Sequence, residues 1–546
     1  MLTVLRLYAV LVISLIGFSP FSMAADSESE PLNQDAFSQV LLGKNSANKQ
    51  QAVSWLVTSY SSEISKPILV AWLEGDLFYL KETNNPLNAS LFIIEALQVG
   101  GQAKHVWSDN LVKIENIRQF KKVKVDNKLR SVLRSQIATL GLHSANVEMR
   151  KASVQALIGH SDQNVTMQLK QLISSEQDSD IKALLELAIA VDAALDGSNA
   201  QQLSAIESLA DYNQPVVLST LNQVLATEQD ERILTAAQRS LQHYQQSQRF
   251  YSGVETLFFG LSLGSVLVLA GIGLAITFGV MGVINMAHGE LIMLGAYTTY
   301  VMQQLLPNHI GVALLVSIPM AFIVSGLVGV VIERSVIRHL YGRPLETLLA
   351  TFGVSLILQQ AVRSIFSPLN RSVSTPDWMA GALEINPMLS LTYNRLYIIL
   401  FCALVFIGLV MTLKKTPLGL QVRAVSQNRA MARAMGIRSE RVDALTFGLG
   451  SGVAGVAGVA LSQLTNVGPN MGQAYIIDSF MVVVFGGVGN LWGTLVAGLG
   501  LGLFNKILEP WAGAVLAKIL MLVFIILFIQ KRPRGLFPQR GRAAES

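Results

Sequence analysis

Ionisable and amide side chains are rare in the apolar segments of the second half, and among them Asn285, His288 and Glu290 stand out most. Burying such groups among apolar residues is costly unless they face a partner, a cavity or a route for solute. Two interpretations stay open: a pathway or packing network within a membrane, or a turn between two helices. Gln359 and Asn490 are further hydrogen-bonding side chains in apolar surroundings, and all five are candidates for a translocation path.

No set of residues has the pattern of a catalytic centre. The apolar segments contain no HExxH, GxSxG or paired-carboxylate motif. The only Gly-Lys pair, Gly43-Lys44, lacks the rest of a phosphate-binding loop, so any ATP must be hydrolysed on another subunit. The single cysteine, Cys402, excludes an intramolecular disulfide and a thiolate metal cluster. The sequence therefore predicts no catalytic residue, no metal site and no cofactor.

Composition divides the chain into a polar half suited to water and an apolar half suited to a lipid membrane. The 546 residues are 51% hydrophobic and only 14% charged, which excludes a purely soluble protein. Residues 1–250 carry a net charge of −4 and residues 251–546 a net charge of +9. The positive excess lies in the apolar half, where it marks one side of a membrane, and we expect no nucleic-acid partner.

The first 24 residues have the layout of a secretory signal peptide. Arg6 precedes an apolar stretch over 7–18, and Ser22 and Ala24 occupy the small positions of a cleavage site. An uncleaved anchor is the alternative. Either way, the sequence predicts that residues 25–250 form an exported, periplasmic domain.

This exported domain is predicted to be mostly helical, with a few strands. A Gln/Ser/Asn-rich stretch through Gln50 is typical of a loose arm. Short apolar runs between Pro67 and Val125, Ile68–Leu73 among them, favour strands. Beyond Leu129, Ala and Leu recur at helical spacing, which fits either a HEAT-type solenoid or a plain helical domain.

Residues 251–535 are predicted to form an all-α polytopic membrane domain, followed by a tail over 536–546. We expect nine helical crossings, the seventh and eighth short enough to be re-entrant: residues 256–277, 283–305, 310–332, 346–366, 396–413, 443–464, 474–488, 491–507 and 512–530. Glycines recur in the sixth and eighth spans, which favours close packing of helix backbones. The run Gly486–Asn490 favours a turn or a broken helix.

Charge predicts the orientation of these spans. If the exported domain places the start of the first span outside, an odd number of crossings places 333–345, 414–442 and 531–546 inside. Those segments hold 15 of the 20 Lys and Arg residues of the membrane half, in agreement with the positive-inside rule. The C-terminus is therefore predicted to be cytoplasmic.

The segment 414–442 is the longest of these inner segments. Ser426 or Asn428 could cap a short helix over Arg429–Met435, which Gly436 would end in the left-handed conformation. Such a helix, basic on one face and apolar on the other, suits docking on another protein or on anionic lipid headgroups. Orientation by charge alone is the alternative.

Three motifs resemble the LivH-type permease subunits of branched-chain amino acid ABC importers: Gly279-Val-Met-Gly-Val-Ile-Asn-Met-Ala-His-Gly-Glu-Leu-Ile-Met-Leu-Gly-Ala-Tyr297, Leu349-Ala-Thr-Phe-Gly-Val-Ser-Leu-Ile-Leu-Gln359 and Arg423-Ala-Val-Ser-Gln-Asn-Arg-Ala-Met-Ala-Arg-Ala-Met-Gly-Ile437. The resemblance covers roughly residues 255–535. An exported domain before such a permease is similar to the urea-transporting branch of the family. An amino-acid or short-amide importer is the nearest alternative, and a membrane sensor is a more distant one.

The resemblance implies a bacterial inner-membrane protein that is not an enzyme. Its implied partners are a second, LivM-type permease, two cytoplasmic ATP-binding subunits, a periplasmic solute-binding protein and membrane lipid. It also implies an ATPase-coupling loop made of Arg423, Asn428, Arg429, Ala430, Ala432, Arg433, Gly436, Ile437 and Arg438. The family pattern Glu-Ala-Ala is replaced here by Ala430-Met431-Ala432, so a salt bridge from the missing carboxylate is not expected.

Overall fold

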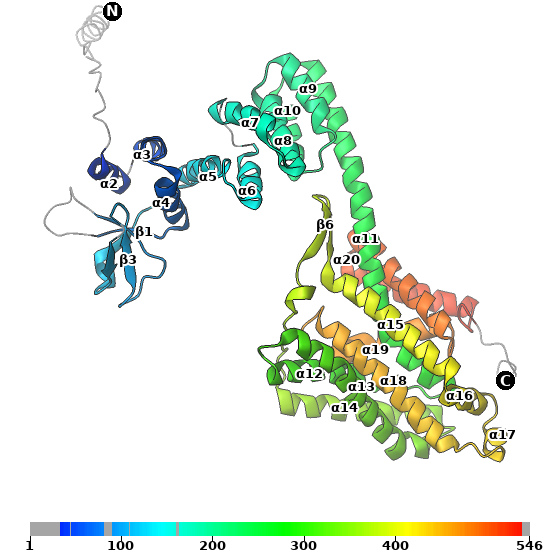
Figure 1. Ribbon diagram of the computed structural model, residues 1–546. Helices are drawn as coiled ribbons and strands as arrows, with labels where there is room; N and C mark the ends of the chain where they lie inside the picture. Colours follow the sequence, from blue (N-terminus) through cyan, green and yellow to red (C-terminus); the bar gives the residue numbers. More distant parts are fainter. Residues whose placement is uncertain (1–32, 44, 81–89, 109, 160–162, 538–546) are drawn as a thin grey trace, which may run out of the picture. The chain divides into compact units, whose positions relative to one another are not determined.

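Figure 1 shows the computed structural model, which describes residues 33–43, 45–80, 90–108, 110–159 and 163–537. The predicted signal peptide lies outside the described residues. The chain divides into two compact units, one of residues up to 241, apart from 213–215, and one from residue 242 onward. Helix α11, Glu231–Met281, contributes residues to both.

The first unit opens with three helices, α2 (Gln34–Leu42), α3 (Ser46–Ser59) and α4 (Ser62–Glu74). The prediction of a loose arm through Gln50 is therefore wrong from residue 34 onward, because Asn33 and Asn45 cap these helices. The strand predicted over Ile68–Leu73 is also wrong. Its apolar run lies within α4, whose buried residues Ile68, Leu69 and Trp72 recur at helical spacing.

A five-stranded antiparallel sheet with the order β4-β3-β2-β1-β5 follows α4. Its strands are β1 (Leu77–Leu80), β2 (Leu91–Ile93), β3 (Gln102–His105), β4 (Leu111–Lys113) and β5 (Phe120–Lys122), and the 3-10 helix η1 (Ile117–Gln119) precedes β5. Apart from the run Ile68–Leu73, the prediction of a few strands between Pro67 and Val125 is confirmed by this sheet.

Six short helices complete the first unit. They are α5 (Asn127–Gly141), α6 (Val147–Leu157), α7 (Gln163–Ser175), α8 (Ser179–Asp196), α9 (Asn199–Leu209) and α10 (Pro215–Thr227). Helix α8 packs against α6, α7 and α9. An apolar cluster from α5 to α8, with Leu157, Leu169 and Leu185 at its centre, holds them together.

The second unit is a bundle of apolar helices. After α11 come α12 (His288–Leu305), α13 (Ile310–Ser335), α14 (Pro344–Phe366), α15 (Tyr393–Lys415), α16 (Pro417–Gln427), α17 (Arg429–Ala434), α18 (Ser439–Ser462), α19 (Met471–Gly486) and α20 (Leu491–Lys531). The linking elements are η2 (Ile337–Leu340), η3 (Asp377–Met379) and the hairpin of β6 (Ala382–Asn386) and β7 (Leu389–Thr392).

Among the described residues, six helices are long and apolar enough to cross a membrane: α11, α13, α14, α15, α18 and α20. The second and seventh predicted spans correspond to α12 and to α19, which is shorter. The eighth and ninth both lie in α20, which changes direction at Gly513, where φ is +73°. Phe504 packs on Phe524 with ring centroids 5.3 Å apart, so the two halves of α20 fold back on each other.

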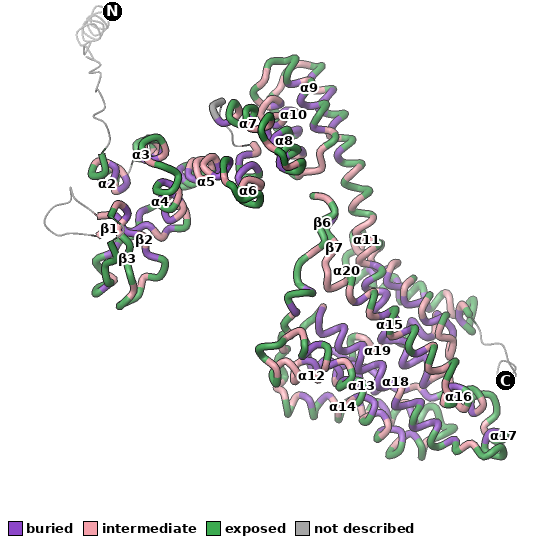
Figure 2. The backbone as a smooth tube through the Cα atoms, viewed as in Figure 1, coloured by how far each residue is buried: buried purple, intermediate pink, exposed green. Residues whose placement is uncertain are grey.

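Helix α18 forms the centre of the bundle. It is buried along nearly its whole length (Figure 2) and packs against both α12 and α13. A Cβ atom at Gly458 would collide with the carbonyl oxygen of Ile292, and one at Gly295 with that of Gly455. The backbones of α12 and α18 therefore touch, as the glycine pattern predicts.

Candidate functional site

Helix α12 begins inside the bundle rather than at its edge. Residues 282–287, between α11 and α12, are not helical. The chain turns back at Gly282, where φ is +65°, and then runs beside α11. The ring Nε2 of His288 donates a hydrogen bond of 2.9 Å to the carbonyl oxygen of Ala270. Ala270 lies three turns before Met281, roughly 16 Å along the helix. The start of α12 therefore lies about three turns away from the end of α11, inside the bundle.

The start of α19 lies beside the start of α12. A Cβ atom at Gly289 would collide with the backbone of Gly472, so the two helix N-termini are in backbone contact. Neither α12 nor α19 has a capping side-chain hydrogen bond. Two sets of helix-terminal N–H groups, each at the positive end of a helix dipole, therefore converge inside the bundle.

Asn285 and Glu290 flank the start of α12, and both are about 1% exposed. Glu290 Oε1 accepts a hydrogen bond of 3.0 Å from Ser355 Oγ. Asn285 Oδ1 accepts one of 3.0 Å from the N–H of Ala287. Within the described part of the chain, Glu290 Oε2 and Asn285 Nδ2 have no partner. A buried acceptor and a buried donor are thus left with hydrogen-bonding capacity for a water or another small polar molecule.

A stripe of polar side chains on α14 faces this site. Its members recur every fourth residue and are at most 5% exposed: Thr347, Thr351, Ser355 and Gln359. Thr351 Oγ1 accepts a hydrogen bond of 3.2 Å from the N–H of Met286. The spacing was visible in the sequence, but only Gln359 was identified there as a candidate.

The stripe continues to an exposed end. Gln359 Nε2 donates hydrogen bonds to the carbonyl oxygen of Pro469, at 3.3 Å, and to Asn470 Oδ1, at 3.1 Å. Arg363 Nη2 donates to the same oxygen of Asn470 at 2.6 Å. Asn470 is exposed and Glu290 is buried, so hydrogen-bonding groups lead from the surface of the bundle to its interior.

The five residues predicted to line a path have different surroundings. Glu290 bonds to Ser355 of α14, and Gln359 lies four residues further along that helix, where it bonds to Asn470, whereas Asn285 bonds to the N–H of Ala287 before α12. His288 is fully buried but directs its ring to α11. Asn490 lies in the turn between α19 and α20. Its side chain caps α20 by accepting a hydrogen bond from the N–H of Gly493, and it donates one to the carbonyl oxygen of Phe537.

A second group of predicted residues lies on α16 and α17. The predicted short helix is confirmed as α17, and Asn428 Oδ1 caps it by accepting from the N–H of Met431 at 2.9 Å. Gly436 follows with φ at +86°, the left-handed conformation that the sequence predicted. Arg423, on α16, donates a hydrogen bond of 2.7 Å to the carbonyl oxygen of Leu413.

Helix α17 is attached to α18 by polar and apolar contacts. Arg429 forms an ion pair with the buried Asp443, and Arg433 Nε donates a hydrogen bond of 2.7 Å to Ser439 Oγ. Ala432 is buried in an apolar cluster against which Ile437 packs.

The other side of α17 is open. Ala430 and Arg438 are exposed, and so are Met431 and Met435, at 61% and 77%. Two flexible thioether side chains on a basic helix make an adaptable contact surface. Sequence reasoning missed both methionines, although their position four residues apart on one face could have identified them.

Comparison with known proteins places the membrane unit in a family. The sequence profile of the permease component of branched-chain amino acid transport systems matches residues 256–529, half of the chain. The chain belongs to this permease family. Among its relatives, the permease protein BraD of Pseudomonas aeruginosa is 30% identical over 295 residues, which cover 52% of this chain and 96% of BraD.

Two LivH proteins give the same result. LivH of Escherichia coli is 30% identical over 301 residues, 53% of this chain and 97% of LivH. The probable LivH of Methanocaldococcus jannaschii is 25% identical over 283 residues, 50% of this chain and 88% of that protein. No solved structure matches the chain.

Membership of the permease family fixes the general role of the protein. It is a multi-pass inner-membrane subunit of an ABC importer, and such permeases are not enzymes, because ATP is hydrolysed by partner subunits. The relatives' alignments account for about half of this permease, so the first unit is additional to the part they share.

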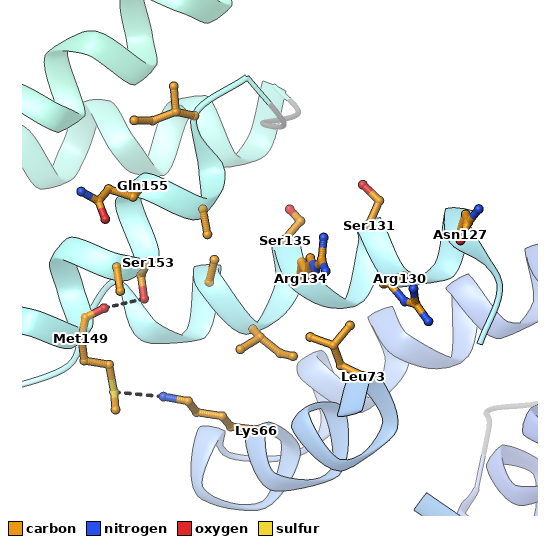
Figure 3. A pocket seen from close by; sticks show the side chains of 15 residues that line it. Lys66, Leu73, Asn127, Arg130, Ser131, Arg134, Ser135, Met149, Ser153 and Gln155 are labelled. Atoms are coloured by element: carbon orange, nitrogen blue, oxygen red, sulfur yellow. Dashed lines mark hydrogen bonds between the residues drawn. The ribbon is translucent and has the colours of Figure 1, made fainter. Parts of the chain in front are cut away.

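The first unit has one large groove of its own, with a volume of about 840 Å³ between α4, α5 and α6 (Figure 3). Lys66, Arg130 and Arg134 line it together with several serine hydroxyls. Lys66 Nζ lies 3.0 Å from Met149 Sδ. This groove was not predictable from local sequence patterns, because its lining residues come from three separate helices.

Proposed function

We propose that this permease carries urea across the inner membrane by alternating access, through the site formed by Asn285, Glu290 and the polar stripe of α14. The observation that carries the proposal is the meeting of two uncapped helix starts around two unpartnered buried atoms, Glu290 Oε2 and Asn285 Nδ2. Interrupted helices that meet near the membrane centre are a common way to build a transport site.

Urea matches these groups atom by atom. Its two NH₂ groups can donate hydrogen bonds to the Glu290 carboxylate. Its carbonyl oxygen is an acceptor, which Asn285 Nδ2 and the helix-terminal N–H groups can satisfy. Urea is neutral, so binding requires no counter-charge in the membrane interior.

The close packing of the site favours a small solute. The backbones of α12 and α19 touch at Gly289 and Gly472, and a Cβ atom at Gly472 would lie only 2.7 Å from Glu290 Oε2. A solute of four heavy atoms needs little displacement of these helices, whereas a branched aliphatic side chain needs a much wider opening.

The second candidate is a branched-chain amino acid, the substrate class in the relatives' names. The same groups offer it partners, because Glu290 could accept from an ammonium group and the helix starts could bind a carboxylate. Neutralising Glu290 would cost urea one charge-assisted hydrogen bond, whereas an amino acid would lose the counter-charge of its ammonium group, which makes this residue the discriminating one.

The experiment that tests the proposal is uptake of radiolabelled urea in cells from which this chain is deleted and then restored, with leucine and acetamide as competitors. We expect deletion to abolish urea uptake, and leucine not to compete. Glu290→Gln keeps an acceptor oxygen but loses the charge, and should lower urea uptake about tenfold, the cost of one weakened hydrogen bond to a charged group. Glu346→Gln, the same change at an exposed residue of α14, is the matched control. If deletion of the chain left urea uptake intact but abolished leucine uptake, the substrate would be a branched-chain amino acid rather than urea.

We further propose that α17 is where the ATP-binding subunits dock, and that α18 carries the movement to the site. The Arg429–Asp443 ion pair joins α17 to α18, and Gly455 and Gly458 join α18 to α12, which begins at the site. The remaining partners are a LivM-type permease and a periplasmic solute-binding protein, with the first unit periplasmic and the C-terminus cytoplasmic.

Gly436 provides a test of this coupling. A Cβ atom there meets nothing within 4 Å, so substitution strains the left-handed backbone without causing a collision. Gly436→Val should misplace α17 and reduce uptake while ATP hydrolysis by the assembled importer continues. Gly436→Asn, which tolerates this conformation, is the control and should retain most uptake. Equal transport by both variants and the unmodified chain would contradict the coupling role.

A further inference from the structure

A cavity of about 300 Å³ opens at the end of the membrane unit where α11 ends. The last turns of α11 and α15, one face of α16 and the turn between α19 and α20 line it. Lys414 and Arg423 contribute the charged groups of its lining. Within the described residues, neither cation is in an ion pair with a carboxylate, so two positive charges remain available at the mouth.

The cavity continues along the bundle as an apolar groove. A second cavity of about 400 Å³ lies between α11, α15 and α20, and Val410 and Trp492 line both cavities. Except for Ser265, the lining of this second cavity is apolar, with Phe406 and Leu495 among its members. The basic cavity and the apolar cavity therefore adjoin at Val410 and Trp492.

We propose that these two cavities bind one anionic phospholipid, with the phosphate between Lys414 and Arg423 and an acyl chain along Phe406 and Leu495. Basic residues at the membrane surface attract anionic headgroups, and buried methylene groups add affinity along the groove. An acidic partner protein would account for the cations but not for the groove, which runs alongside three membrane helices. A neutral lipid would account for the groove but not for the cations.

The bound lipid would stabilise the connection between α15 and α16. Its headgroup contacts Lys414 at the end of α15 and Arg423 on α16, and Arg423 already bonds back to Leu413. Helix α16 leads directly to α17, so the lipid composition of the membrane affects the segment proposed to dock the ATP-binding subunits. The lipid site itself does not depend on the identity of the solute.

Trp492 is a reporter at the junction of the two cavities. The full chain is placed in phosphatidylcholine vesicles that contain a small fraction of brominated phosphatidylglycerol or, in parallel, brominated phosphatidylcholine. Subtracting the signal of Trp492→Phe isolates the fluorescence of this residue from the other five tryptophans. We expect the anionic lipid to quench Trp492 at a lower mole fraction than the neutral lipid.

Substitutions separate the headgroup from the acyl chain. Lys414→Ala should reduce the preference for the anionic lipid roughly fivefold, the usual effect of one basic residue at a membrane surface. Lys415→Ala is the matched control, because Lys415 is an adjacent exposed lysine outside the cavity lining. Ala403→Phe fills the apolar groove without changing charge and should reduce quenching by both lipids.

Three results would overturn the proposal. Equal quenching by the two lipids would show that the cavity has no preference for an anionic headgroup. Equal effects of Lys414→Ala and Lys415→Ala would show that anionic lipid is attracted to the basic surface in general rather than to this cavity. Loss of quenching when the ATP-binding subunits assemble would make the cavity a protein contact. Because no solute is present, failure here is distinguishable from failure of urea transport.

Discussion

The two units of this permease hold their helices together by different means. In the first unit, large apolar side chains such as Leu157, Leu169 and Leu185 fill the space between helices. In the membrane unit, α18 meets α12 through Gly455 and Gly458, with backbone against backbone. Water drives apolar side chains together, but lipid does not, so membrane helices rely on close backbone contact.

This difference predicts where each unit is vulnerable. The first unit should tolerate backbone changes at helix surfaces and be sensitive to lost side-chain volume. The membrane unit should tolerate changes at lipid-facing positions and be sensitive to any added atom at the α12–α18 contact.

The largest effect should come from Gly458→Leu. A Cβ atom at this position collides with the carbonyl oxygen of Ile292, so α12 and α18 must separate along their contact. Because this contact also positions Glu290, we expect loss of transport and little assembled protein in the membrane, measured by uptake and by membrane-fraction immunoblot.

Gly408→Leu is the control for the same substitution. Gly408 lies on α15, where an added Cβ atom meets nothing within 4 Å. We expect nearly normal amounts of protein and nearly normal uptake. Equal loss in both variants would mean that leucine itself, rather than the backbone contact, is not tolerated.

Leu185→Ala tests the packing of the first unit. Leu185 is 1% exposed within the α5–α8 cluster, and truncation leaves a cavity that should cost about 2–5 kcal/mol of local stability. Hydrogen exchange on the full chain should show faster exchange in α7 and α8 and unchanged exchange in α18. Faster exchange in α18 as well would contradict the independence of the two packing systems.

Local signals in the sequence predicted much of this architecture. The Asn428 cap, the left-handed Gly436 and the turn at Gly486–Asn490 depend on neighbouring residues, and the structure contains all three. The apolar run Ile68–Leu73 was misassigned because a short buried run has no period that separates strand from helix.

The candidate site was only partly predictable. Asn285 and Glu290 were recognisable as polar residues in an apolar segment. Ser355 and Asn470, which complete the site and its entrance, lie 65 and 111 residues away from Glu290 and Gln359, respectively. Contacts of such separation depend on how the helices pack, and no local pattern records the approach of α19 to α12.

A helix cap should have a smaller effect than either packing change. Asp178 caps α8 by accepting hydrogen bonds from the N–H groups of Asp180 and Ile181, at 2.9 and 3.2 Å. Asp178→Ala should cost about 1 kcal/mol, visible as faster exchange in the first turn of α8. Asp180→Ala removes the same charge without removing the cap and should have a clearly smaller effect. Helices α12 and α19, which begin at the candidate site, have no capping side-chain hydrogen bond, so no matching loss is expected there.

The smallest effect should be the pH dependence of one ion pair in the first unit. Arg150 binds Glu176 through two hydrogen bonds of 3.0 Å, which lower the pKa of Glu176 below its ordinary value of 4.5, with help from the N–H groups of Asp178 and Gln177. A lowered pKa in the folded state means that the stabilisation is complete above pH 4.5 and is lost as the pH falls through the folded-state value. Protection factors in α6 and at the start of α8, corrected for intrinsic exchange, should therefore decrease on acidification.

Glu176→Gln should have lower protection near neutral pH and a flatter response to acid. An equally steep acid response in this variant would assign the pH dependence to other carboxylates. The α12–α18 contact is made by glycine backbones, which do not titrate, so its protection should stay constant over the same range. A parallel loss of protection in α18 would break the distinction between a unit held by side chains and one held by backbone contact.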